Sequence, residues 1–219
     1  MVIIAGQIAA LLIFVVVRLA TNFNPKFDDL AANGNVLAFG TLVNTLTVVG
    51  LIVLLVRVRR YPVRDYLALT WPPVRSVLIA CAGLAVLLCT SDLISYLLGR
   101  PLVPPVMVDV YRAAWLPALL LALVVLAPLG EETLFRGFLF EGIATSRAGP
   151  VVAILVSSVA WALLHVQYDW YGIVSIAVIG LYLGVVRYRT ASVLVTMLLH
   201  ALSNAGATLE MVVQEHWLK

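Results

Sequence analysis

The chain has 219 residues, of which 63% are hydrophobic and only 11% charged, and its formal net charge is +3. Soluble domains average about half apolar and a quarter charged residues, and folding at this size still leaves roughly a third of the chain's area exposed. The composition therefore excludes a water-soluble globule and predicts an integral membrane protein surrounded by lipid. No basic tract is interleaved with aromatic residues, so we expect no nucleic acid as a partner.

Seven apolar windows are separated by short segments that contain helix breakers. They cover residues 2–20, 36–56, 74–98, 113–140, 151–165, 172–186 and 191–209. The first window has no basic residue ahead of it, unlike a signal peptide, so we expect it to stay as an anchor. The windows lack the alternating pattern of a lipid-facing barrel. We therefore predict an all-α, polytopic bundle that forms one membrane domain over residues 1–219.

The fourth window raises a question about the number of spans. As a single helix, residues 113–143 would measure about 46 Å, against a hydrocarbon core of about 30 Å. Pro128 and Gly130 could split this stretch in two. The bundle then has eight spans instead of seven, which changes the side of the C-terminus.

The distribution of basic residues predicts the orientation, because Lys and Arg collect in cytoplasmic loops. Eight residues share the side of the loop that follows the second span, and five lie on the opposite side. The first group is Arg57, Arg59, Arg60, Arg64, Arg75, Arg147, Arg187 and Arg189, and the second is Arg18, Lys26, Arg100, Arg112 and Lys219. This bias predicts a cytoplasmic N-terminus. We expect the membrane to be a bacterial inner membrane.

A few polar residues interrupt three of the last four windows, although an ionisable group there costs about 2.5–3.5 kcal/mol. They are Glu131, Glu132, Arg136, His165, His200 and Asn204. Counted from the basic turn at Arg147, Glu131 and His165 both lie about 22–24 Å deep, on neighbouring antiparallel helices. His200 and Asn204 lie about 15–21 Å from a second turn on the same side. We therefore expect these side chains to converge in one layer.

Helical spacing separates the expected roles. Glu132 and Arg136 are four residues apart, so they share a helix face and can form an ion pair. Glu131 points about 100° away, with no charged partner on its own helix, which makes it the candidate general base. His200 and Asn204 are also four apart and can offer two donors to a developing oxyanion.

Three ordered motifs carry a family resemblance. Glu131-Glu132-x-x-x-Arg136, Trp161-x-x-x-His165 and His200-x-x-x-Asn204 resemble the CAAX-prenyl-protease and bacteriocin-processing (CPBP, or Abi) family of intramembrane endopeptidases. The resemblance covers residues 128–204, the expected catalytic core region, with Trp161 where the family more often has Phe.

The resemblance implies a helical bundle around a buried, water-filled polar cavity. It also implies that Glu131 activates water with help from His165, while His200 and Asn204 form the oxyanion site. Glu132, Arg136 and Trp161 would support the architecture. The implied substrate is a peptide of the prenylated CAAX type or of the bacteriocin or leader type, and no cofactor is required.

Two alternatives stay open at this point. In the first, the peptidase is metal-dependent, and a divalent ion such as zinc is bound by Glu131, His165 and His200, with Glu132 as a further ligand. In the second, the protein is a non-catalytic immunity or scaffold protein, or a small carrier, that uses the same polar layer. Interhelical hydrogen bonds are the structural explanation for His200 and Asn204.

Overall fold

The computed structural model describes residues 33–217, and this part of the chain is helical without a strand. The helices are α3 (Gly34–Val58), α4 (Val63–Tyr66), α5 (Val74–Leu97), α6 (Pro105–Arg112), α7 (Leu116–Leu120), η1 (Leu121–Leu126), α8 (Ala127–Glu132), η2 (Thr133–Leu139), α9 (Phe140–Ala144), α10 (Gly149–Ala162), α11 (Trp170–Thr190) and α12 (Val193–Trp217). The predicted all-α membrane bundle is thus confirmed.

Five helices in the described residues are long and apolar enough to cross a membrane. They are α3, α5, the continuous stretch Leu116–Ala144, α11 and α12. Each coincides with a predicted window to within a few residues at most ends, although α12 continues eight residues beyond its window. The predicted window at residues 2–20 lies outside the described residues, as do Arg18, Lys26 and Lys219. The orientation of the bundle stays a prediction.

The stretch Leu116–Ala144 is one continuous helix, so Pro128 and Gly130 do not split it. It contains two π-helical segments, η1 and η2, and the N–H of Ala127 bonds to the carbonyl of Ala122, five residues back. In this register the carbonyl of Leu123 would pair with the nitrogen of Pro128, which carries no proton. The proline is therefore accommodated by a wider turn and frees a carbonyl for another helix.

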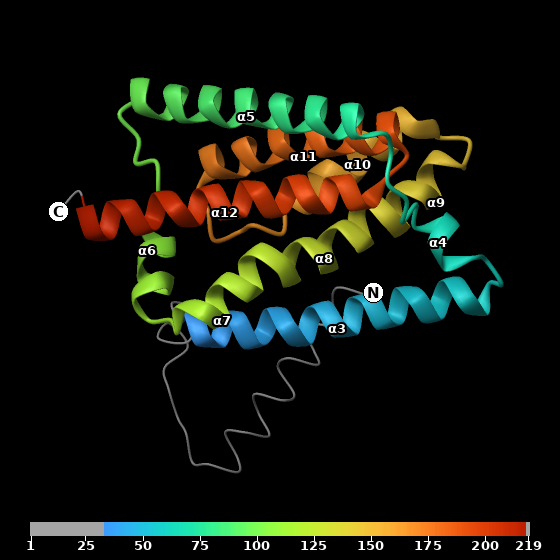
Figure 1. The fold of residues 1–219 in the computed structure, drawn as a ribbon, viewed down its shortest axis with the longest axis horizontal. Helices are drawn as coiled ribbons and strands as arrows, with labels where there is room; N and C mark the ends of the chain where they lie inside the picture. Colours follow the sequence, from blue (N-terminus) through green and yellow to red (C-terminus); the bar gives the residue numbers. More distant parts are fainter. Residues whose placement is uncertain (1–32, 218–219) are drawn as a thin grey trace, which may run out of the picture.

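The Leu116–Ala144 helix runs diagonally across the bundle, between α3 on one side and α12 on the other (Figure 1). Helix α5 lies beside α11 and α12, and α10 packs along α11 as an antiparallel pair. The Thr45 hydroxyl of α3 donates to the Leu126 carbonyl at 2.8 Å. A Cβ on Gly130 would lie 2.9 Å from Thr45 Oγ1, so this glycine allows α3 and α8 to approach closely.

Helix α10 ends three residues before the end of its predicted window, and this places His165 differently. Its 14 residues extend about 20 Å, less than the roughly 30 Å of the hydrocarbon core. The helix ends at Ala162, so His165 lies on the turn between α10 and α11 instead of inside a span. Helix α11 begins at an N-cap, Asp169, whose carboxylate accepts the Gly172 N–H at 2.9 Å. This bond and the Arg100 side chain lower the pKa of Asp169.

Two glycines of α11 let this helix approach α10 closely beside Trp161. A Cβ built on Gly180 of α11 would lie 3.1 Å from Trp161 Cε3, 3.3 Å from Ser158 Cβ and 3.4 Å from a terminal guanidinium nitrogen of Arg136. A Cβ on Gly184 would lie 3.0 Å from Ile154 Cγ2. Gly180 therefore sets the distance between the two helices at the level of Trp161.

We expect Gly180→Ala to lower the thermal unfolding temperature in detergent, because overpacking of a filled interior costs about 1–3 kcal/mol. The matched control is Gly50→Ala in α3, where an added methyl group meets nothing within 4 Å. Relief of the helix penalty of glycine, up to about 1 kcal/mol, should leave that variant as stable as the parent or more so. An equal response of the two variants would contradict the close packing at Gly180.

Candidate active site

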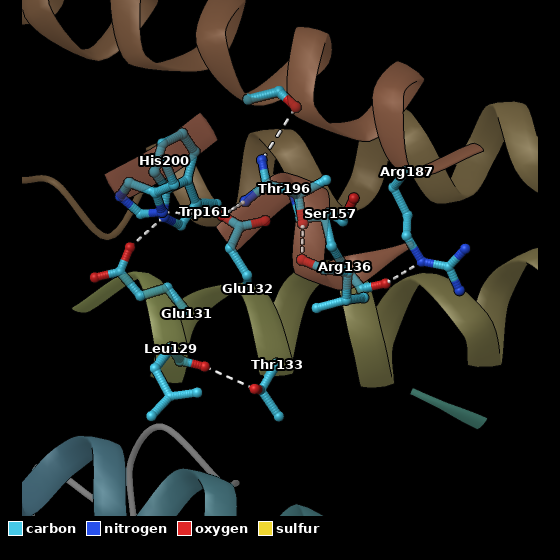
Figure 2. A network of polar contacts seen from close by, with 12 residues as sticks. Leu129, Glu131, Glu132, Thr133, Arg136, Ser157, Trp161, Arg187, Thr196 and His200 are labelled. Carbon is cyan, nitrogen blue, oxygen red and sulfur yellow. Dashed lines mark hydrogen bonds and ion pairs between the residues drawn. The ribbon is translucent and has the colours of Figure 1, made fainter. Parts of the chain in front are cut away.

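A charged network lies in the interior of the bundle. Glu132 Oε1 accepts hydrogen bonds from Arg136 Nη1 at 2.8 Å and from His200 Nδ1 at 3.0 Å. The side chains of Glu132 and Arg136 are 0% exposed, and that of His200 is 5% exposed. Arg136 Nη2 also donates to the Gly180 carbonyl at 3.0 Å. The ion pair expected from the spacing is present, and the network around it joins α11, α12 and the Leu116–Ala144 helix (Figure 2).

Glu131 points to a different part of the site, as its place on the helix predicts. It is half-buried, and its Oε2 accepts a hydrogen bond from Trp161 Nε1 at 2.5 Å. The carboxylate therefore has a neutral partner from another helix, which the spacing of the charged residues did not reveal. The indole holds Oε2 of Glu131, and Oε1 takes no part in this hydrogen bond.

Trp161 lies at the centre of the predicted residues, not at their edge. Its ring meets the imidazoles of His165 and His200 edge-on, with centroids 5.1 and 5.2 Å away. The guanidinium carbon of Arg136 lies 4.7 Å from the centroid of the indole. Figure 2 shows the Glu131 carboxylate directed at this indole. A single side chain therefore brings Glu131, His165, His200 and Arg136 together.

Both imidazoles use Nδ1 within the protein. His165 Nδ1 lies 3.0 Å from the Trp161 carbonyl, and His200 Nδ1 lies 3.0 Å from the Glu132 carboxylate. A carbonyl and an ionised carboxylate only accept, so we assign the proton to Nδ1 in both rings. A neutral ring then has a basic Nε2, and a doubly protonated ring donates through Nε2. His165 is half-buried, so the cluster is accessible on the side of His165 and Glu131.

Asn204 lies one turn further along α12 and contacts the η1 segment of the Leu116–Ala144 helix. Its Nδ2 donates to the Leu123 carbonyl at 2.7 Å, the carbonyl that Pro128 leaves free in η1. This bond supports the interhelical explanation for Asn204. A carboxamide has two N–H donors, so the second one stays available for an oxyanion.

The part of the sequence that contains these residues is similar to a known protein family. Residues 113–206 match the family model of the Type II CAAX prenyl endopeptidase Rce1-like proteins. The match confirms the resemblance to the CPBP family, and we call this segment the Rce1-like region. It contains all three motifs and the whole of the charged network described above.

One curated relative aligns with a short part of the chain. The UPF0177 protein YxdF of Lactococcus lactis subsp. lactis (strain IL1403) is 43% identical over 47 residues, which is 22% of this chain and 24% of the relative. The alignment thus spans about a quarter of the length of that relative. No solved structure matches the chain.

Two residues of the Rce1-like region join the site without having been predicted. The Tyr168 ring lies 6.2 Å from that of His165, and burial together with the charge of Glu131 raises the pKa of Tyr168. Arg187 was expected in a basic loop, but α11 continues to Thr190 and Arg187 is 4% exposed. Its Nε donates to the Arg136 carbonyl at 2.8 Å, and its Nη2 donates to Glu141 Oε2 at 2.9 Å.

Arg187 therefore braces the π-helical segment η2 from within α11. We expect Arg187→Lys to destabilise the fold by about 1–3 kcal/mol, because an ammonium cannot keep both hydrogen bonds of the planar guanidinium. The control is Arg189→Lys, which changes an exposed residue two positions away. Equal unfolding temperatures for the two variants would contradict the bracing role.

The residues considered as metal ligands are held by separate partners. Glu131 accepts from the Trp161 indole, His165 donates to the Trp161 carbonyl, and His200 donates to Glu132. Within residues 33–217, no three His, Cys, Asp or Glu side chains form a group that could hold a metal ion. In the metal-dependent alternative, Glu132 would have to leave Arg136, whereas Oε1 of Glu131 and Nε2 of both imidazoles take no part in these hydrogen bonds.

Proposed function

We propose that this protein is an intramembrane endopeptidase in which Glu131 activates water to hydrolyse a peptide bond. The observation that carries the proposal is the arrangement around Trp161, where a half-buried carboxylate shares one indole with two imidazoles. The match of residues 113–206 to a family of endopeptidases supports the same reaction class.

In the proposed reaction, Glu131 Oε1 takes a proton from a water molecule whose oxygen attacks the carbonyl carbon of the peptide bond. His165 Nε2 accepts the second hydrogen of this water and orients it. The negative charge moves to the carbonyl oxygen, which receives hydrogen bonds from Nε2 of a doubly protonated His200 and from the second N–H of Asn204. Collapse of this intermediate breaks the C–N bond, and the proton taken by Glu131 passes to the leaving amine.

The buried network supports these groups without reacting. Glu132 orients the His200 ring by accepting the hydrogen bond of its Nδ1. Arg136 balances the charge of Glu132. We propose a peptide held at the membrane as the substrate, either a prenylated CAAX-type tail or a bacteriocin or leader peptide. Glu131 and His165 are the accessible members of the cluster and would meet this peptide first.

The substrate is tested with a library of quenched fluorescent peptides, with and without a prenyl group, and the purified full chain in detergent. We expect cleavage of at least one peptide by the wild type.

In the same assay, we expect His165→Ala to lower the rate of cleavage by about 10²–10⁴-fold, because that ring assists the base. Unfolding temperatures should be alike, since His165 lies on a turn. Normal turnover by His165→Ala would remove His165 from the mechanism.

Removal of metal separates the two versions of the peptidase. We expect activity to persist after dialysis against EDTA, with no stoichiometric metal in the purified protein, because the proposed base and donors are all side chains. Loss of activity on chelation, followed by recovery with zinc, would establish the metal-dependent alternative.

A further inference from the structure

We propose that Trp161 is a positioning residue whose indole N–H fixes the Glu131 carboxylate and leaves Oε1 to face the attacking water. This inference rests on the proposed function, because it concerns how the base of that reaction is aimed. It assigns to Trp161 a polar role in addition to packing.

The hydrogen bond uses the only polar group of the indole. Trp161 is 4% exposed, and Nε1, its single donor, is directed at Glu131 Oε2. Trp161 belongs to α10 and Glu131 to α8, so the bond joins two helices that are far apart in the sequence. The aim of the carboxylate therefore depends on the position of α10 relative to α8.

The indole itself is held on several sides. Its plane lies at 78° to the His165 ring and at 76° to the His200 ring, and the Arg136 guanidinium covers it at 4.7 Å. Gly180 packs so closely that an added Cβ would lie 3.1 Å from the ring. Rotation of the indole would break these contacts together. The donor is thus fixed before any substrate binds.

Glu131 requires such a partner because it is half-buried and no charged residue lies four positions away on its own helix. A free glutamate side chain samples several rotamers, whereas a general base must stay within about 2.6–3.2 Å of the atom whose proton it takes. By holding Oε2, the indole restricts the carboxylate to orientations in which Oε1 is free. The same residue accepts a hydrogen bond from His165 through its carbonyl, so base and assisting imidazole are oriented together.

Phenylalanine separates packing from hydrogen bonding at this position. Trp161→Phe keeps an aromatic ring between the two imidazoles but has no N–H. We expect kcat to fall about 10- to 100-fold on a quenched fluorescent peptide with a farnesylated CAAX tail. KM should change little, whereas the unfolding temperature should fall moderately, because the smaller ring leaves a cavity in a closely packed interior. The matched control is Trp170→Phe, at a residue that is 77% exposed, which should leave kcat unchanged.

A measurement without substrate tests the hydrogen bond directly. The chain has five tryptophans, and NMR of the full chain with isotope-labelled indoles, in detergent, reports each indole N–H. The resonance that Trp161→Phe removes should shift in Glu131→Ala, and by less in Glu131→Gln, whose amide oxygen still accepts. If Glu131→Ala does not fold, the shift in Glu131→Gln decides. A resonance that moves in neither variant would overturn the proposal.

The outcomes distinguish this inference from the function on which it rests. If Trp161→Phe cleaves as fast as the wild type while Glu131→Gln is inactive, the positioning role is wrong and the peptidase proposal stands. If Glu131→Gln cleaves normally, the peptidase mechanism is wrong, and Trp161 no longer positions a base.

Discussion

Replacing Glu132 with alanine is expected to remove most of the folded protein, together with its activity. The change leaves Arg136 as a fully buried cation without its counter-charge, and it removes the acceptor of His200 Nδ1. Breaking a buried ion pair from one side costs about 3–5 kcal/mol, a large part of the 5–15 kcal/mol that stabilises a typical domain. We expect a low yield after extraction and a strongly reduced unfolding temperature.

A double variant distinguishes the stranded charge from a general loss of packing. Replacing both residues, as in Glu132→Met with Arg136→Met, removes the charges together, and such exchanges are often neutral or stabilising. We expect this variant to recover most of the unfolding temperature but not the activity, because His200 still lacks its partner. A well-folded, fully active Glu132→Ala protein would contradict the structural role of the ion pair.

Replacing Glu131 with glutamine is expected to abolish hydrolysis while the fold persists. The amide has nearly the same shape and can still accept the Trp161 N–H, so little stability should be lost. It cannot take a proton from water. Loss of a general base lowers the rate by about 10²–10⁴-fold, which is the effect we expect on kcat.

Glu210→Gln is the matched control for that experiment. It makes the same chemical change on α12, at a residue outside the network around Trp161, and should leave turnover unchanged. A scaffold, an immunity protein or a carrier has no need of a base at Glu131. Such a protein would tolerate Glu131→Gln in its own assay, and the hydrolase proposal would then be wrong.

The helical spans could be predicted from the sequence because lipid imposes a simple requirement. A span needs about 20 apolar residues, and its backbone must satisfy its own hydrogen bonds. The windows at 36–56 and 74–98 therefore correspond closely to α3 and α5. The pairing of Glu132 with Arg136 follows from the pitch of a single helix in the same way.

Features that depend on contacts between helices could not be predicted in this way. The π-helical segments change the hydrogen-bond register without changing the apolar pattern. The sequence therefore left open whether Pro128 splits the helix in two. Helix α10 ends at Ala162 although its apolar residues continue, which moved His165 onto a turn.

Arg187 and Trp161 show the same limit at the level of side chains. Arg187 looked like a loop residue because its partners, the Arg136 carbonyl and Glu141, lie some 50 residues away in the chain. The resemblance implied that Trp161 supports the architecture. Its hydrogen bond to Glu131 depends on the distance between α10 and α8, which no local pattern encodes.

The central claim is that Glu131 activates water inside the helical bundle, and single-turnover hydrolysis in heavy-oxygen water tests it most directly. Mass spectrometry locates the label after one cleavage by the full chain in detergent. We predict one heavy oxygen atom in the new carboxyl terminus of the product and none in Glu131, because the oxygen comes from water and the carboxylate only moves a proton. Label in Glu131 with an unlabelled product would show that the carboxylate attacks the peptide itself, and would contradict the mechanism.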